Sequence, residues 1–207
     1  MRNRVRRRGA LRELVSIRPG YPFRGKLALD DYGDAFVVQF RHVAVGKRLD
    51  DEFGKSFDRA ALSGRKQPDY LRSGDVLFMA KGSRNHAVVI GDVPENTVCT
   101  PNFYHIRLKP NVDDLLPEFL AWQINHRYAQ RYFSICSQGS VAPSITKVQL
   151  GELPIAIPPL EEQKQMVNLA DAATREHELL SQLIANRQRM IDAVGSHLLR
   201  PDPTKGN

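Results

Sequence analysis

The chain has 207 residues, of which 42% are hydrophobic and 26% charged, a composition typical of one medium globular domain with an appendage. No apolar run approaches the roughly 18 residues of a membrane span, and the basic start lacks the apolar stretch of a secretory signal. Residues 1–150 hold 24 basic and 15 acidic residues, whereas residues 151–207 hold 6 and 8. This charge distribution predicts a nucleic-acid surface followed by a protein-binding segment.

Both ends of the chain are polar. Five of the first eight residues are arginines, so we expect a basic disordered arm over residues 1–9 and a flexible tail over 201–207. A mitochondrial presequence is the alternative for the arm on charge alone. The two cysteines, Cys99 and Cys136, lie far apart and form no metal-binding pattern, which favours free thiols in a reducing cytoplasm.

The front part alternates short elements. Apolar residues at Leu11, Leu14 and Val15 predict a short amphipathic helix over residues 10–18 that ends at Pro19. Runs rich in Val, Phe and Ile then predict strands within 35–43, 74–82, 86–93 and 98–109. The polar stretch 46–73 reads as a long loop or an irregular hairpin.

A second helix is predicted over residues 115–133. Asp113 and Asp114 are expected to cap its start, and Pro117 fits the first turn, where a missing N–H costs nothing. A loop rich in Gly, Ser and Thr follows at 136–147. Prolines then hold residues 153–159 in an extended conformation.

From Leu160 the pattern changes to one long helix of about 40 residues, about 60 Å at ~1.5 Å per residue. Residues at alternating steps of three and four form a seam, eight of whose ten members are apolar, as in a coiled coil. This seam comprises Met166, Ala170, Ala173, His177, Leu180, Ile184, Arg187, Ile191, Val194 and Leu198. It is too long to hide against a domain of this size, so we expect a partner helix; the alternative is a helix folded over its own domain. The two polar members are expected to tune register and pairing.

Catalytic motifs are missing from the sequence. It holds no phosphate-binding loop, no nucleophile elbow and no metal-binding His or Cys spacing. The one double proline lies between Ile157 and Leu160, so it lacks the polar and aromatic neighbours with which an adenine methyltransferase grips a flipped base. A metal-dependent nuclease at Asp69 and Asp75 is the alternative, but Leu77 stands where such a site needs lysine. We therefore expect no enzyme activity, no metal and no cofactor.

Residues 139–163 and the helix that follows them together resemble the type I restriction-modification specificity subunits. The first part of residues 139–163 matches the family's Gly-Ser-x-x-Pro-Ser-Ile stretch through Gly139, Ser140, Pro143, Ser144 and Ile145. The second part matches its Pro-Leu-Glu-Glu-Gln opening of a long helix through Pro158, Pro159, Leu160, Glu161, Glu162 and Gln163. Residues 11–25, 73–83 and 115–126 are more loosely similar to other parts of that family.

The resemblance implies an α+β fold in which a mixed or antiparallel β-rich target-recognition domain with short helices, residues 10–157, precedes a dimerising or partner-binding helix, residues 158–200. The typical subunit repeats this unit twice, whereas the present sequence contains it once and shows no internal repeat. It therefore resembles a half-subunit that dimerises, or a relative in another phage-defence system. The implied partners are double-stranded DNA, a DNA adenine methyltransferase subunit and a restriction nuclease subunit.

Base and phosphate contacts are expected from exposed basic and amide side chains near predicted turns and loops. The candidates are Arg24, Lys26, Arg41, Lys81, Arg84, Asn85, Gln138, Ser140, Ser144 and Lys147. His42, His86 and His105 lie in strand-like runs and are expected to be structural or to contact bases. Two other classes of function stay open: a protein–protein adaptor with an incidental basic surface, and an RNA-binding module using the aromatic residues of 102–108.

Overall fold

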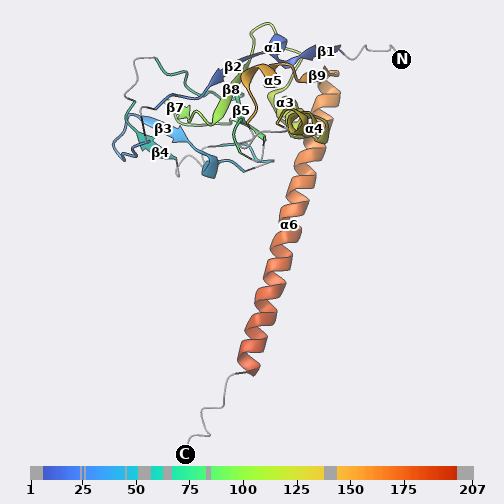
Figure 1. The fold of residues 1–207 in the computed structure, drawn as a ribbon. Helices are drawn as coiled ribbons and strands as arrows, with labels where there is room; N and C mark the ends of the chain where they lie inside the picture. The colour runs from blue at the N-terminus through green and yellow to red at the C-terminus, as the bar shows by residue number, and fades with distance from the viewer. Residues whose placement is uncertain are drawn as a thin grey trace, which may run out of the picture. The chain divides into compact units, whose positions relative to one another are not determined.

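The computed structural model describes residues 7–23, 25, 27–44, 46–50, 57–62, 67–82, 85–137 and 144–199. The chain divides into two compact units, residues 1–167 and 168–207. It is an α+β protein with mostly antiparallel sheets, short helices and a long C-terminal helix (Figure 1), as the sequence predicts.

A four-stranded antiparallel sheet forms the centre of the first unit. Its strands run in the order β2 (Val15–Pro19), β8 (Phe103–Leu108), β5 (Val76–Met79) and β6 (Ala87–Val89). Side chains alternate between the two faces of the sheet along each strand. Each face packs into a hydrophobic core. Val76, Phe78 and Ile106 belong to one core, whereas Leu77, Val88 and Phe103 belong to another.

Four short helices contribute to the first of these cores. They are α1 (Leu11–Leu14), α3 (Pro117–Asn125), α4 (Arg127–Cys136) and α5 (Lys147–Gly151). Leu11, Phe119, Phe133 and Leu150 are buried there, and the ring centroids of Phe78 and Phe133 lie 5.0 Å apart. The helices that precede and follow the Gly-Ser loop are therefore fixed to the central sheet.

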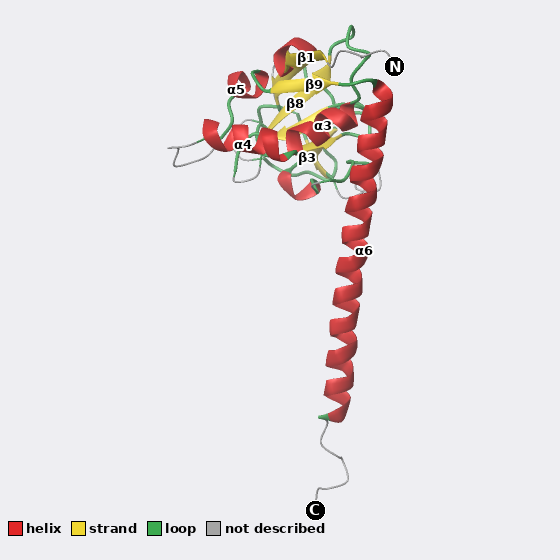
Figure 2. Cartoon of the chain, turned by 90° about the vertical axis from the view of Figure 1, so that its right-hand side faces the viewer, coloured by secondary structure: helices red, strands yellow, loops and turns green. Residues whose placement is uncertain are grey.

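Two smaller sheets complete the first unit. β3 (Ala35–Val38) pairs antiparallel with β4 (Asp58–Ala60) and parallel with β7 (Thr97–Cys99), and Val38 and Cys99 join the second core. A 3-10 helix, η1 (Phe40–His42), follows β3. β1 (Arg7–Ala10) pairs with β9 (Pro154–Ile157), as both views show (Figure 2).

The helix predicted over residues 10–18 is wrong beyond its first turn. Leu11 and Leu14 face the core from α1, but Val15 and Ile17 lie in β2 and pair with β8. The short apolar pattern in residues 15–18 fits the spacing of a helix and of a strand equally well. Pairing with β8 of the central sheet makes it a strand.

The boundary of the basic arm also needs correction. Residues 7–9 belong to β1, whose partner β9 is the extended proline-rich segment that the sequence predicts. An edge strand needs a partner for its backbone groups, and the arm supplies it. Residues 1–6 lie outside the described residues.

The helix predicted over 115–133 is two helices, because His126 has an extended backbone with φ −72° and ψ 149°. Pro117 occupies the first turn as predicted, but the capping by Asp113 and Asp114 is wrong. Instead the Leu116 N–H donates to Gln163 Oε1 at 2.9 Å.

The long helix is α6 (Leu160–Leu198), with 39 residues. Within the first unit its Met166 and Val167 pack against the core, and Gln163 is fully buried. In residues 168–199 the large apolar side chains are exposed, for example Leu180 at 53% and Ile184 at 70%. None of the described helices is long and apolar enough to cross a membrane.

Candidate nucleic-acid interface

The turn between β5 and β6 lies beside the end of the Gly-Ser loop. Lys81 and Ser144 form an isolated antiparallel bridge, and the Ile145 N–H donates to the Ala80 carbonyl at 2.9 Å. Ile145 is 1% exposed and belongs to the first core, whereas the side chains of Lys81 and Ser144 are exposed. A buried anchor thus presents two neighbouring polar side chains to solvent from segments 63 residues apart in sequence.

A capping box continues this surface into α5. The Gln149 N–H donates to Thr146 Oγ1 at 3.2 Å, and the Thr146 N–H donates to Gln149 Oε1 at 2.9 Å. This reciprocal pair starts the helix at Lys147, whose side chain is exposed. Gln149 Nε2 also donates to the Cys136 carbonyl at 3.2 Å, which ties α5 to the end of α4.

Asn85 is held inside the hairpin turn. Its side-chain Nδ2 donates to the Met79 backbone carbonyl at 3.0 Å. Its backbone carbonyl accepts from Gln130 Nε2 of α4 at 2.7 Å. One of the two N–H groups of the Asn85 side-chain amide is thus engaged within the protein. Asn85 therefore shapes the turn and joins it to α4.

The hairpin turn, α4 and α5 also carry exposed cations. Among the described residues, Lys81, Arg127, Arg131 and Lys147 are exposed and have no carboxylate within salt-bridge distance. The sequence analysis did not select Arg127 and Arg131 of α4. Their spacing of four places them on one helix face, a signal that was available once this segment was assigned as a helix.

The predicted contact residues fall into three groups. Lys81, Asn85, Ser144 and Lys147 come together at the hairpin turn and the start of α5. Arg41 lies in η1, not at a strand end, and pairs with Asp58 of β4. Five others lie outside the described residues: Arg24, Lys26, Arg84, Gln138 and Ser140.

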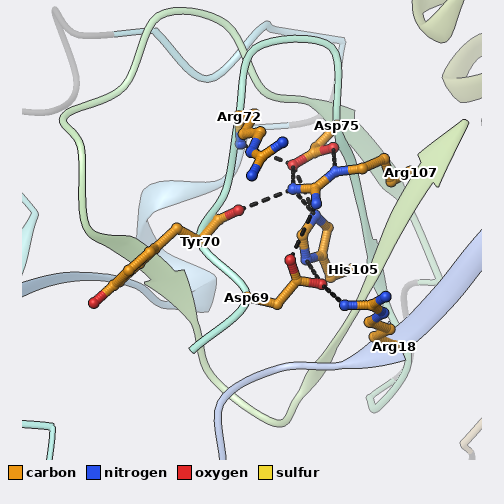
Figure 3. A network of polar contacts seen from close by, with 7 residues as sticks. All are labelled: Arg18, Asp69, Tyr70, Arg72, Asp75, His105 and Arg107. Carbon is orange, nitrogen blue, oxygen red and sulfur yellow. Dashed lines mark hydrogen bonds and ion pairs between the residues drawn. The ribbon is translucent and has the colours of Figure 1, made fainter. Parts of the chain in front are cut away.

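A network of charged groups lies beside β5 and β8 (Figure 3). Arg107 Nε donates to Asp75 Oδ1 and its Nη2 donates to Asp75 Oδ2, both at 2.7 Å, while Nη1 donates to Asp69 Oδ1 at 3.0 Å. His105 Nε2 lies 2.7 Å from Asp75 Oδ2, and Arg18 Nη1 donates to Asp69 Oδ2 at 2.7 Å. The network fastens the segment that leads into β5 to β8 and β2.

The carboxylate at the centre of this network is charged. Burial alone would raise the pKa of Asp75, but hydrogen bonds from Arg107 and His105 outweigh it and lower the pKa below its ordinary value. The same bond to Asp75 raises the pKa of Arg107. Because Arg107 forms ion pairs with both Asp69 and Asp75, the two carboxylates belong to a structural ion-pair network. Among the described residues, no cluster of His, Cys, Asp and Glu is suited to a metal.

Two of the three histidines in strand-like runs, His42 and His105, are buried, which favours a structural role over base contact. His105 is 3% exposed within the network, and His42 is 7% exposed, with its Nδ1 accepting from the Gln39 N–H at 3.1 Å. Burial lowers the pKa of His42, although Asp58 opposes that shift. Alternation along β8 puts His105 and Arg107 on one side of the strand, and two polar residues at this spacing were the available sequence signal for the network.

The comparisons with known proteins agree with this architecture. Residues 60–186 match the family profile described as type I restriction modification DNA specificity domain. A curated protein of Methanocaldococcus jannaschii, a type I restriction enzyme MjaX specificity subunit, is 31% identical over 100 residues, which cover 46% of this chain and 23% of the relative.

Solved structures share the fold at low sequence identity. A chain from work on complex assembly and conformational transition of the type I R-M system has a TM-score of 0.62 at 18% identity, covering 91% of this chain and 43% of that one. The HsdS subunit from Thermoanaerobacter tengcongensis has a TM-score of 0.58 at 19% identity, over 86% and 39%. The S subunit from M. genitalium has a TM-score of 0.55 at 14% identity, over 93% and 45%. The chain thus spans less than half the length of each of these relatives.

Proposed function

Because this chain belongs to the family of type I restriction modification DNA specificity domains, we propose that it is the sequence-specific recognition subunit of a restriction-modification or related defence complex. It binds double-stranded DNA in the cytoplasm and directs a partner adenine methyltransferase, and a nuclease where the complex has one. The chain itself has no catalytic role in this proposal.

The surface formed by the hairpin turn, α4 and α5 is the observation that carries the proposal. It carries four exposed cations that have no carboxylate partner among the described residues, and its hairpin turn is fixed to the core through Ile145. These cations are Lys81, Arg127, Arg131 and Lys147. Cations neutralise phosphates and supply affinity, while rigidly held neighbours give the register that base reading needs. An adaptor with an incidental basic surface would not need these groups to be held at one place.

The second copy of the recognition domain is proposed to come from a homodimer. The α6 seam exposes the apolar side chains of Leu180, Ile184 and Ile191. Two α6 helices paired antiparallel would hide these side chains and give a symmetric dimer that reads two inverted half-sites. The same helices are the proposed binding place of the methyltransferase partner.

Duplex selection tests the proposal. The full chain is incubated with randomised duplex DNA, and the bound fraction is sequenced. We expect a bipartite, inverted motif. The variant Lys81→Ala/Lys147→Ala should reduce the slope of log affinity against log salt by about four for the dimer, since each protomer loses two phosphate contacts. The matched control Lys164→Ala/Arg175→Ala removes the same charge from α6 and should leave the slope unchanged.

The result that overturns the proposal is binding with no motif, or equal loss of affinity in both double variants. Preference for single-stranded RNA over duplex DNA would instead support the RNA-binding alternative. Methyl transfer to DNA by the purified chain would contradict its assignment as a subunit without a catalytic role.

A further inference from the structure

Two side-chain amides of α3 bind backbone groups at the edges of two different sheets. Asn125 Oδ1 accepts from the Ala87 N–H of β6 at 2.7 Å, and Asn125 Nδ2 donates to the Ala87 carbonyl at 2.8 Å. Gln123 Oε1 accepts from the Ala156 N–H of β9, and Gln123 Nε2 donates to the Ala156 carbonyl, both at 2.9 Å. Each amide thus takes the place of a neighbouring strand at one residue.

The edge strand β6 needs such partners on its outer side. It is the last strand of the four-stranded sheet, so the outward backbone groups have no strand beside them. At its far end the Leu49 N–H donates to the Val89 carbonyl and the Gly91 N–H donates to the Leu49 carbonyl, both at 2.9 Å. Asn125 serves Ala87, at the end of β6 that follows the hairpin turn.

Gln130 of α4 holds the hairpin turn itself. Its Nε2 donates to the Asn85 backbone carbonyl at 2.7 Å and to the Ile124 carbonyl at 2.8 Å. Ile124 lies in the last turn of α3 and is fully buried in the first core. Since Asn125 directly follows Ile124, both attachments of the turn start from the same buried point.

The same junction also sets where the cations of α4 lie, because α4 begins directly after it. Arg127 is the first residue of α4, and Arg131 lies one turn later. On the other side, Asn85 Nδ2 reaches the Met79 carbonyl at the end of β5, two residues before Lys81. The cation of the hairpin turn and the two cations of α4 therefore belong to one frame joined through the α3–α4 junction.

We infer that Asn125 and Gln130 are positioning residues for DNA recognition, which hold the hairpin turn at a fixed place beside α4. The inference rests on the proposed function and assigns a role to two residues outside the proposed contact set. Hydrogen bonds to base edges weaken steeply when their geometry is lost, whereas the Coulomb energy of a phosphate contact varies slowly with distance. Loss of either residue should therefore reduce discrimination between DNA sequences more than nonspecific affinity.

Gln123 supplies the comparison that separates positioning from stability. It lies on the same helix, is half-buried like Asn125, and makes the same pair of bonds, but to β9 instead of the strand that follows the turn. A variant that only lowers stability lowers the concentration of folded protein, which weakens binding to every duplex by the same factor. The ratio of affinities for two duplexes is therefore unchanged by a purely structural loss.

The test measures this ratio in the full chain. The variants Asn125→Leu, Gln130→Met and Gln123→Met each remove the amide and keep the approximate side-chain size. Anisotropy at one salt concentration gives dissociation constants for a duplex with the motif selected by the parent chain and for one with that motif scrambled. We expect the ratio to fall about tenfold for Asn125→Leu and for Gln130→Met, the size of one lost base contact, and to stay within about twofold for Gln123→Met.

The outcomes separate this inference from the proposed function. Urea unfolding confirms that each variant is folded at the assay temperature. If Asn125→Leu does not fold, Asn125→Asp replaces it with the same expectation, because it keeps the bond from the Ala87 N–H and loses the bond to the Ala87 carbonyl. A parent chain that discriminates, with unchanged ratios in the Asn125 and Gln130 variants or an equal fall in Gln123→Met, would overturn the inference alone. A parent chain that selects no motif would overturn the proposed function and the inference with it.

Discussion

At the scale of single residues, the buried polar groups of the first unit explain why its surface residues hold their places. Asp75 and Arg107 fasten the segment before β5, and the hairpin turn that carries Lys81 follows β5 directly. Gly74, next to Asp75, has φ +86°, a conformation that side-chain-bearing residues rarely adopt. The turn before β5 thus depends on both a glycine and a charged network.

We predict that Asp75→Asn lowers the free energy of unfolding by about 1–3 kcal/mol, because Arg107 and His105 lose their charged hydrogen-bond partner while Arg107 keeps Asp69. The measurement is urea unfolding at neutral pH. Asp92→Asn, which removes an exposed carboxylate from the segment after β6, is the control and should change stability little.

Stability should also depend on pH through Asp75. Its folded pKa is lowered, so its contribution is fully present above its unfolded pKa of about 3.9 and is lost as pH falls from there through the folded pKa. As pH falls below about 4, the free energy of unfolding should therefore decrease less steeply for Asp75→Asn than for the parent chain. Parallel curves for the two proteins would argue against a charged Asp75 in the fold.

Gln163 offers a second residue-scale prediction. Its Nε2 donates to the carbonyls of Asp114 and Pro158, both at 2.7 Å, and its Oε1 accepts from the Leu116 N–H. Gln163→Ala leaves three partly buried backbone groups without this partner, and we expect a loss of about 1–3 kcal/mol in unfolding free energy. Gln165→Ala, on the exposed face of the same helix, should cost far less.

At the scale of elements, α6 exposes a row of large apolar side chains to water in the single chain. We predict that Ile184→Asp/Ile191→Asp abolishes dimer formation, because each substitution would bury an unpaired charge in the seam. Sedimentation at micromolar concentration measures the mass. Gln182→Asp/Arg189→Asp changes positions outside the seam and should leave the dimer intact.

Long or strongly patterned elements could be predicted from the sequence, and short ones could not. The 39 residues of α6 and the strands β5, β6 and β8 follow from periodicity and from Gly and Pro at their ends. Residues 15–18 were predicted as helix and are strand, because pairing with β8 outweighs a pattern only four residues long. The break at His126 and the role of Gln163 depend on contacts between segments distant in sequence, which local patterns do not contain.

The candidate surface was predictable in part for the same reason. The sequence predicts polar residues both in the turn between β5 and β6 and in the Gly-Ser loop. The structure joins the two segments through the bridge between Lys81 and Ser144. Arg41 is a candidate because of its charge, but its guanidinium pairs with Asp58 of β4. Asp58 lies in the stretch 46–73, for which the sequence predicts a long loop or an irregular hairpin.

At the scale of the whole molecule, DNA affinity should depend steeply on salt. If the dimer contacts about six phosphates, its affinity should fall roughly a thousandfold between about 50 and 200 mM salt, because each contact releases a condensed counterion. Fluorescence anisotropy with a labelled duplex measures this slope. A flat salt response would show that the basic front part does not engage the DNA backbone.

The pairing of β1 with β9 has a consequence for gene architecture. It brings residue 7 beside the strand that leads into α6. In the proposed antiparallel homodimer, α6 of the second copy would end where α6 of the first begins. A short linker from residue 199 of one copy to residue 7 of another would then join the two chains. Duplication and fusion of such a gene would yield a single polypeptide of about twice this length, with both recognition domains and an intramolecular helix pair. A tandem fusion of this kind should sediment as a monomer and select the same bipartite DNA motif as the unfused dimer.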